Sequence, residues 1–206
     1  MFLSPGIILK AYEKGLFPMS ESFNDPYIHW VYPTERGIIE LEYFRLSKSL
    51  KKVLRKDDFT IKVNTQFEEV INLCARNSFR QNTWINNQII DNYIKLFALG
   101  KAKSVEYFSD NKLLGGLYGL ILGNIFCGES MFSLVENSSK VSMVYLAALL
   151  KQGGYKFIDT QFYSEHLKQF GTKKIKKYDY DKLLKENIGN DLNFPEKLSK
   201  PIFEYF

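Results

Sequence analysis

Residues 102–129 constrain the possible folds more than any other part of the chain. Two turn signals, Asp110-Asn111 and Gly123-Asn124, divide this apolar stretch into pieces of strand length. Pairs of Asn, Asp and Gly between apolar runs typically close β-hairpins. The sequence therefore predicts about three consecutive antiparallel strands.

Helical patterns flank this meander on both sides. Apolar residues recur at helical spacing in residues 65–78 and 86–100 before it. After it, a helix is expected to begin at Asn137 or Ser138, both good capping residues, and to end at the glycine pair 153–154.

The remaining segments add shorter elements. Strands are predicted at residues 37–44, 59–64, 155–161 and 173–180, and helices at residues 5–15, 45–58 and 163–171 and in the C-terminal tail. Helices, an antiparallel meander, another helix and further strands indicate a mixed α/β (α+β) architecture.

The size of the chain suits one large domain, or one domain of usual size with a small companion. It has 206 residues, of which 45% are hydrophobic. No apolar run approaches the roughly 20 residues that a membrane span needs, and the N-terminus has neither a basic leader nor a small-residue cleavage site. A cytoplasmic protein with no membrane partner is expected.

Neither a metal site nor a disulfide is expected. Cys74 and Cys127 stand alone rather than in Cys-x-x-Cys spacing, and only His29 and His166 could join them. The sequence also lacks the dinucleotide, P-loop, hydrolase-elbow and zincin motifs, so those classes have no motif support.

Two basic blocks stand out within a net charge of +5. Residues 46–56 hold five cations and no acid, and residues 168–177 hold five more, again without an acid. Such blocks are either solvated faces or surfaces that bind a polyanion.

A few polar and aromatic residues are candidates for chemistry or binding. Glu129 directly follows an apolar run, where an unpaired buried charge would be costly, so its side chain is either exposed or paired, for example with Lys140. Strand alternation places Asp159 and Gln161 on one face of an apolar segment. Asp159 can equally be a cap or turn residue, and Trp84 a packed core ring.

Several segments together carry a resemblance to a known family. They are AYEKGLFPM (11–19), WVYPTER (30–36), TWI (83–85), SVEYF (104–108), LLGGLYGLILGNIFCGESMFS (113–133) and FIDTQFYSEHLKQFG (157–171). In this order they closely resemble the leucyl/phenylalanyl-tRNA–protein transferases of bacteria, over nearly the whole chain. The sequence departs from the family at Val31, where an aromatic residue is usual.

The resemblance implies an aminoacyltransferase that uses no cofactor. Such enzymes transfer Leu, Phe or, less readily, Met from aminoacyl-tRNA to the N-terminal Lys or Arg of a protein, which marks that protein for degradation. The resemblance also implies a Gcn5-related acetyltransferase-like main domain, expected over residues 38–206, after a small N-terminal α/β part over residues 1–37. A monomer is expected.

The resemblance further implies which residues form the site. Asp159 and Gln161 take places at the reaction centre, and Glu129 lies beside the terminal adenosine and the aminoacyl ester. The aminoacyl pocket and the adenosine contact map onto Trp84, Phe126, Met131 and Ile158. Because strict alternation would set Phe126 opposite Glu129 and Met131, a β-bulge is expected, with Gly128 as its place.

The reaction is the attack of an amine on an ester. The α-amine has an unperturbed pKa near 8, so we expect Gln161 to orient it, while Asp159 fixes Gln161 and stabilises developing positive charge. For the tRNA acceptor stem we rank one set of lysines first because it directly follows residues 157–171: Lys173, Lys174, Lys176 and Lys177. The second set is Lys48, Lys51, Lys52, Arg55 and Lys56.

Two other functions remain open from the sequence. An acetyl-CoA-dependent N-acetyltransferase on the same fold would need a glycine-rich turn for the pyrophosphate, and the sequence has none. A catalytically silent RNA-binding module would keep the basic blocks but would gain nothing from Asp159 and Gln161.

Overall fold

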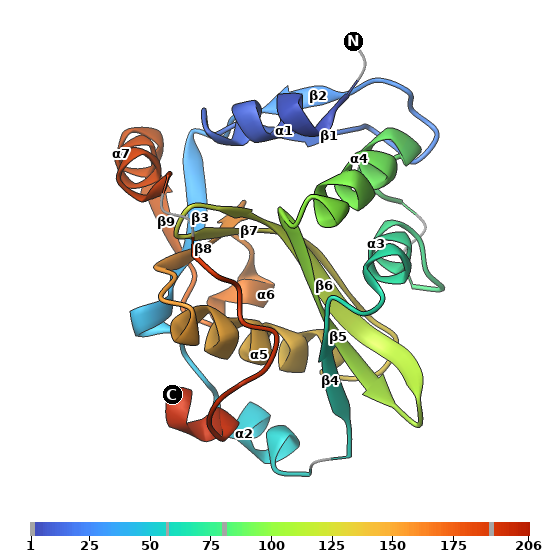
Figure 1. The fold of residues 1–206 in the computed structure, drawn as a ribbon, viewed down its shortest axis with the longest axis vertical. Coiled ribbons are helices and arrows are strands. Elements are labelled where there is room, and N and C mark those ends of the chain that lie inside the picture. Colours follow the sequence, from blue (N-terminus) through green and yellow to red (C-terminus); the bar gives the residue numbers. More distant parts are fainter. Residues whose placement is uncertain (1–2, 57, 80–81, 190–191) are drawn as a thin grey trace.

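A seven-stranded sheet with the strand order β4-β5-β6-β7-β8-β3-β9 forms the centre of the molecule (Figure 1). The computed structural model describes residues 3–56, 58–79, 82–189 and 192–206. The neighbouring strands of this sheet pair antiparallel, except that β7 and β8 run parallel. The strands are β3 (Glu35–Glu40), β4 (Thr60–Val63), β5 (Ala102–Ser109), β6 (Lys112–Leu122), β7 (Ile125–Ser133), β8 (Phe157–Gln161) and β9 (Lys173–Lys176).

The predicted meander is present as β5, β6 and β7. Asp110 and Asn111 both have positive φ in the first turn, as the two central residues of a type I′ hairpin require. Gly123 in the second turn has φ +56°, and a Cβ there would lie 1.9 Å from the carbonyl oxygen of Asn187. Both turn predictions are therefore confirmed.

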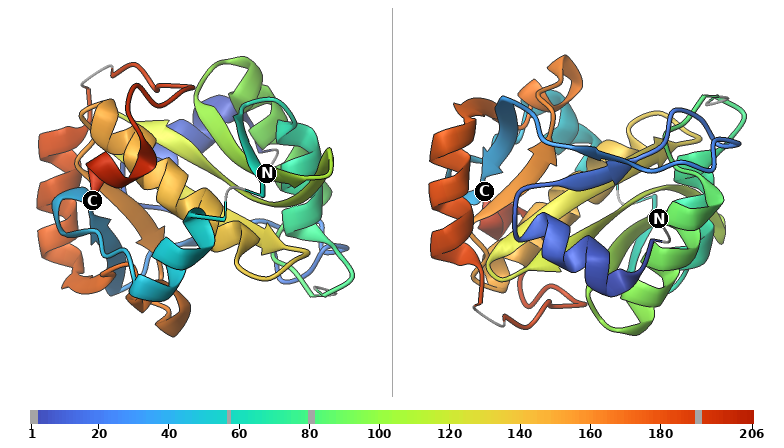
Figure 2. Two further views of the ribbon diagram at one scale, coloured as in Figure 1. Left: turned by 90° about the horizontal axis from the view of Figure 1, so that it is seen from below. Right: turned by 90° about the horizontal axis from the view of Figure 1, so that it is seen from above.

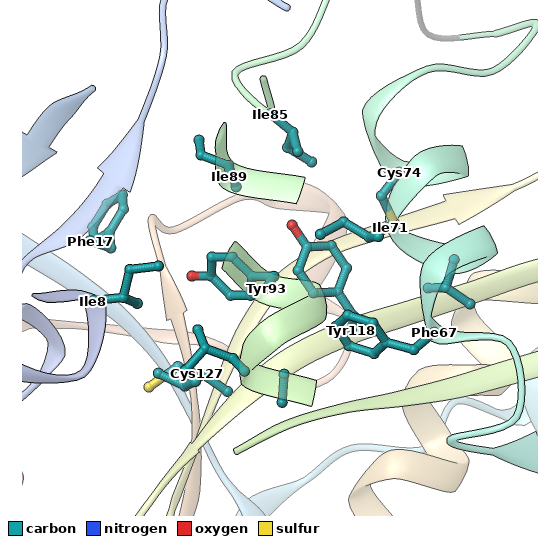
Figure 3. Close-up of a cluster of buried hydrophobic side chains, with 14 of the residues drawn as sticks. Ile8, Phe17, Phe67, Ile71, Cys74, Ile85, Ile89, Tyr93, Tyr118 and Cys127 are labelled. Atoms are coloured by element: carbon teal, nitrogen blue, oxygen red, sulfur yellow. The ribbon is translucent and has the colours of Figure 1, made fainter. Parts of the chain in front are cut away.

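Helices cover both faces of the sheet and enclose two hydrophobic cores (Figures 1 and 2). One core lies beneath α1 (Pro5–Tyr12), α3 (Phe67–Ala75) and α4 (Asn87–Ala98). Figure 3 shows part of it, with Tyr93 and Tyr118 between Ile8 and Phe67. The other core lies beneath α2 (Lys48–Leu54) and α5 (Ser138–Gln152). The mixed α/β architecture with a mostly antiparallel sheet is confirmed.

The remaining elements lie at the edges of the sheet. A two-stranded sheet of β1 (Phe17–Met19) and β2 (His29–Val31) follows α1. The helix α6 (Glu165–Lys168) follows β8, and α7 (Lys177–Asn187) packs beside β3 and β9. Single 3-10 turns lie at Leu41–Tyr43 and Ile202–Tyr205. Among the described residues no helix is long and apolar enough to span a bilayer.

Two predicted strands are too long. Residues 41–43 form a 3-10 turn instead of continuing β3, because Glu40 pairs with Phe157, the first residue of β8. Residues 177–180 begin α7 instead of continuing β9, because Lys176 pairs with Glu35, where β3 starts. Neither segment has a partner strand, and strand structure ends with the pairing.

A β-bulge in β7 confirms the expectation at Gly128. Gly119 of β6 pairs with Gly128, but Tyr118 pairs with Ser130, so Glu129 has no counterpart on β6. The extra residue returns the side chain of Met131 to the face of the sheet that carries Phe126. A bulge of this kind re-aims side chains locally.

Candidate active site

A cavity of about 240 Å³ lies where β7 and β8 meet α5. The bulge of β7, the last residues of β8, the segment around α6 and the loop before α4 all contribute to its wall. The predicted residues that line it are Trp84, Phe126, Glu129, Met131, Ile158 and Gln161. The structure thus gathers six of the seven predicted catalytic and pocket residues around one space.

One wall of the cavity is apolar. Phe126 of β7 and Ile158 of β8 are fully buried, and the two residues pair directly across the parallel strands. Met131 is half-buried, while Met143 and Leu146 of α5 close the same wall. This wall suits a bulky aliphatic or aromatic group.

The cavity is also bordered by the Glu129 carboxylate. The hydroxyl of Tyr12 donates to Glu129 Oε1 at 2.5 Å, and the amide Nε2 of Gln161 donates to the same oxygen at 3.2 Å. Tyr93 is hydrogen-bonded to the Tyr12 hydroxyl at 2.8 Å. Lys140 instead donates to the Asn137 side chain, so the alternative ion pair with Glu129 is not formed.

Burial raises the pKa of Glu129 to about 7, although hydrogen bonds from Tyr12 and Tyr93 act in the opposite direction. The side chain is only 9% exposed and borders the cavity. Near neutral pH this carboxyl group is therefore present in both protonation states, as suits a group that exchanges protons with a substrate.

Asp159 lies behind the wall of the cavity and is fully buried. Arg36 holds its carboxylate in a fork, with Nε donating to Oδ1 at 2.8 Å and Nη2 to Oδ2 at 2.7 Å. Tyr180 of α7 donates to Oδ2 at 2.8 Å, and the backbone N–H of Gln161 donates to Oδ1 at 2.9 Å. Asp159 therefore contacts Gln161 through the backbone.

The two lysine sets differ in their surroundings. On β9, Lys173 pairs with Glu40 at 2.6 Å and Lys174 with Glu35 at 3.3 Å, while Lys177 lies over the ring of Tyr32. On and beside α2, within the described chain, no ion pair engages Lys48, Lys51, Lys52, Arg55 or Lys56. Neither set lines the cavity.

Several site residues were not found from the sequence. Tyr12, Tyr93, Arg36 and Tyr180 all bond to the two carboxylates or to their partners. Tyr12 and Arg36 lie within segments that carry the family resemblance, which was the only signal for them. In the sequence, Tyr93 is an ordinary aromatic residue on the apolar face of a predicted helix, and Tyr180 lies at the end of the predicted strand 173–180.

The site thus joins an apolar wall to a buried carboxylate and amide, which is the arrangement expected of an enzyme that holds an apolar group beside a reacting polar one. Comparison with known proteins narrows this class. The model of the family described as leucyl/phenylalanyl-tRNA protein transferase matches residues 38–185, and the model of that family's N-terminal domain matches residues 1–34.

Individual relatives agree with the family models. A leucyl/phenylalanyl-tRNA–protein transferase of Nitrobacter winogradskyi is 48% identical over 183 residues, which are 88% of this chain and 81% of that protein. One from Rhodopseudomonas palustris is 44% identical over 202 residues, 97% of this chain and 90% of that protein. The chain belongs to the leucyl/phenylalanyl-tRNA protein transferase family and is an aminoacyltransferase.

The solved structures that match this chain are far more distant in sequence. The structure described as L-PGS from Bacillus licheniformis is 13% identical, with a TM-score of 0.45, and the match covers 61% of this chain and 45% of that one. The C-terminal domain of a putative lysylphosphatidylglycerol synthetase from Agrobacterium fabrum is 14% identical, with a TM-score of 0.43, over 77% of this chain and 51% of that one.

Proposed function

We propose that this protein transfers leucine or phenylalanine, and less readily methionine, from aminoacyl-tRNA to the N-terminal Lys or Arg of acceptor proteins, and so marks them for degradation. The cavity supports this proposal, because it places apolar side chains around the same space as Glu129 and Gln161. We propose that the enzyme acts as a monomer in the cytoplasm.

The aminoacyl side chain enters against Phe126, Met131 and Ile158, and the terminal adenosine lies toward Trp84. Burial of an apolar side chain against these residues gives binding free energy that a smaller or charged amino acid does not provide. The ester carbon is then held beside Gln161 and Glu129, which are hydrogen-bonded to each other.

Gln161 orients the attacking amine. Its Nε2 donates to Glu129, so its amide oxygen is left to accept a hydrogen bond from the amine. Glu129, with a pKa of about 7, accepts the proton that the amine loses as the new C–N bond forms and passes it to the ribose oxygen, which leaves with the electrons of the C–O bond. Holding the amine and the ester together lowers the activation free energy by several kcal/mol, up to roughly 7–11 in ideal cases.

The fold assignment is part of the proposal. Two parallel strands, β7 and β8, are connected through α5, and their pairing ends at Cys127 and Asp159, just before the bulge at Glu129; this arrangement supports a Gcn5-related acetyltransferase-like main domain. We also propose residues 1–37 as a small N-terminal part and residues 38–206 as the catalytic domain. The family models, which meet between residues 34 and 38, support this division.

The test is a transfer assay with radiolabelled Leu-tRNA or Phe-tRNA and two peptides that differ only in an N-terminal Arg or Ala. Label is expected in the Arg peptide and not in the Ala peptide. Gln161→Ala should lose transfer, whereas Gln169→Ala, which changes a half-buried glutamine that directly follows α6 and does not line the cavity, should not. Consumption of acetyl-CoA in place of transfer would favour the N-acetyltransferase, and tRNA binding without either reaction would favour the silent RNA-binding module.

A further inference from the structure

Gln161 has a backbone conformation that residues with side chains seldom adopt. Its φ is +53°, and the N–H of Phe162 donates to the carbonyl oxygen of Thr160 at 2.6 Å. A hydrogen bond across one residue with positive φ defines a γ-turn of the rare, strained kind. Such strain persists only where the surrounding structure holds it.

Asp159 holds this turn. Its Oδ1 accepts the Gln161 N–H, and both of its oxygens are already engaged, Oδ1 also by Arg36 Nε and Oδ2 by Arg36 Nη2 and Tyr180. The carboxylate is fully buried and does not border the cavity. Asp159 therefore influences the substrate only through the position that it gives to Gln161.

Arg36 is itself held by three further residues. Its guanidinium lies between the rings of Phe17 and Tyr180, 4.9 and 4.5 Å from their centroids, and Nη1 donates to the carbonyl oxygen of Gly15 at 3.0 Å. The side chain is 1% exposed. A planar, permanently charged group with a fork of donors suits this task better than an ammonium group does.

Space for the turn comes from Gly37 on the neighbouring strand. A Cβ at this residue would lie 2.5 Å from Thr160 Oγ1 and 2.6 Å from the carbonyl oxygen of Phe162. The register between β3 and β8 shifts at the same place, between Gly37 and Ile38. The sheet is therefore shaped around the Gln161 turn.

We propose that Arg36 and Tyr180 are positioning residues of the transfer reaction. They hold Asp159 so that its carboxylate fixes the γ-turn, and Asp159 acts through the Gln161 N–H without taking up the proton of the attacking amine. This inference rests on the proposed function, since it concerns the same transfer.

The first test is Tyr180→Phe, which removes one hydrogen bond and keeps the ring over Arg36. We expect kcat to fall between about 10- and 100-fold, since a misplacement of about 1 Å costs up to about 100-fold. KM for Leu-tRNA should stay within about twofold, because the cavity wall is unchanged. Tyr178→Phe, on the exposed side of the same helix, is the matched control and should leave both constants unchanged. A wild-type kcat in Tyr180→Phe would overturn the proposal.

The second test separates positioning from proton transfer by Asp159. Asp159→Asn leaves the Arg36 charge buried and unpaired, so it should be unstable and poorly active. The double variant Arg36→Met/Asp159→Asn removes both charges, and the new amide oxygen can still accept the Gln161 N–H. We expect the double variant to be at least about tenfold more active than Asp159→Asn. A folded double variant that is no more active than Asp159→Asn, although its Gln161 N–H exchanges with solvent as slowly as in wild type, would mean that the carboxylate itself takes part in proton transfer. Faster exchange would instead assign the lost activity to the lost turn.

A measurement that does not depend on transfer activity tests this inference separately from the proposed function. In ¹⁵N-labelled protein, the backbone N–H of Gln161 should exchange with solvent faster in Tyr180→Phe than in wild type, and Tyr178→Phe should match wild type. Absence of transfer by the wild-type protein would refute the function and leave this measurement valid. Unchanged exchange in Tyr180→Phe would refute the positioning role.

Discussion

Glu129 is the residue whose surroundings determine most of the site's chemistry. A carboxyl group buried beside two phenols and an amide has a pKa of about 7, where the group both accepts and releases a proton. The sequence indicated that Glu129 is either exposed or paired, and the resemblance to the family implied a place near the ester. Its actual partners, Tyr12 and Tyr93, come from other segments, and a single sequence does not contain that proximity.

The pH dependence of transfer should report Glu129. We expect kcat to rise with pH through about 7, as the carboxyl group loses its proton and becomes able to accept another. The amine also becomes more reactive toward pH 8, in the same direction. Tyr12→Phe separates the two effects: it removes a hydrogen bond that lowers the pKa of Glu129, so the rise should move to higher pH, whereas the pKa of the amine is unaffected. An identical pH profile in Tyr12→Phe would contradict the role of Glu129.

Gln161→Glu tests orientation by a neutral amide. The new carboxylate would lie 3.2 Å from Glu129, in the place of the present amide nitrogen, and two like charges at that distance oppose each other. We expect at least a tenfold loss of kcat, roughly the lower limit for a misplaced catalytic group. Gln169→Glu is the control for the added charge. Full activity in Gln161→Glu would show that this side chain acts simply as a base.

Met131→Ala tests the apolar wall. Met131 is half-buried and borders the cavity, so shortening it should enlarge the pocket with little harm to the core. We expect the use of Phe-tRNA to increase relative to Leu-tRNA, because a few buried carbons change discrimination by about 1–3 kcal/mol. Met131→Leu, which keeps most of the volume, should change the ratio less. An unchanged ratio in a folded Met131→Ala protein would assign this residue to the core alone.

At the scale of elements, the sequence predicted what depends on local pattern. The hairpins at Asp110-Asn111 and Gly123-Asn124 were predictable because turn residues act over a few positions, and the helix that begins at Ser138 because its apolar residues recur at helical spacing. The ends of β3 and β9 were not, because a strand ends where its distant partner ends. The turn at Gln161 also escaped prediction, since it depends on Asp159 being held by Arg36 and Tyr180.

The prediction for tRNA binding concerns the lysines of β9 and the first residue of α7. Changing Lys173, Lys174, Lys176 and Lys177 together to Ser should weaken binding of any charged tRNA and flatten its salt dependence, by about 0.7–0.9 in slope for every phosphate group that these lysines neutralise. The preference for Leu or Phe should not change. The ion pairs of Lys173 and Lys174 do not preclude this role, because exposed pairs are worth at most about 1 kcal/mol.

The second set of basic residues, on and beside α2, provides the comparison. The same change to Ser at Lys48, Lys51, Lys52 and Lys56 should leave the salt slope nearly unaltered. If the salt slope instead changes with the substitutions in the second set and not with those in the first, the ranking of the two sets is wrong. If it responds to neither, both are solvated faces.

At the scale of the whole molecule, the raised pKa of Glu129 links the site to stability. With a folded pKa of about 7 and an ordinary value of 4.5, the native state holds more protons than the unfolded state between these values. The free energy of unfolding should therefore decrease as pH rises from about 4.5 to about 7, and this contribution is fully present only below 4.5. Thermal unfolding of wild type and Glu129→Gln at pH 5 and pH 8 should show a smaller loss in the variant. Equal losses would mean that Glu129 is not the group responsible.

The hydrogen bonds that build the site join residues far apart along the chain: Tyr12 with Glu129, 117 positions apart, and Arg36 with Asp159, 123 positions apart. During synthesis the β-meander can form as soon as it leaves the ribosome, because its contacts are local. The site must wait until Tyr180 has emerged, well after the meander. A nascent chain therefore acquires its meander well before its site is complete, and a ribosome-bound fragment that ends before α7 lacks the Tyr180 hydrogen bond that holds Asp159.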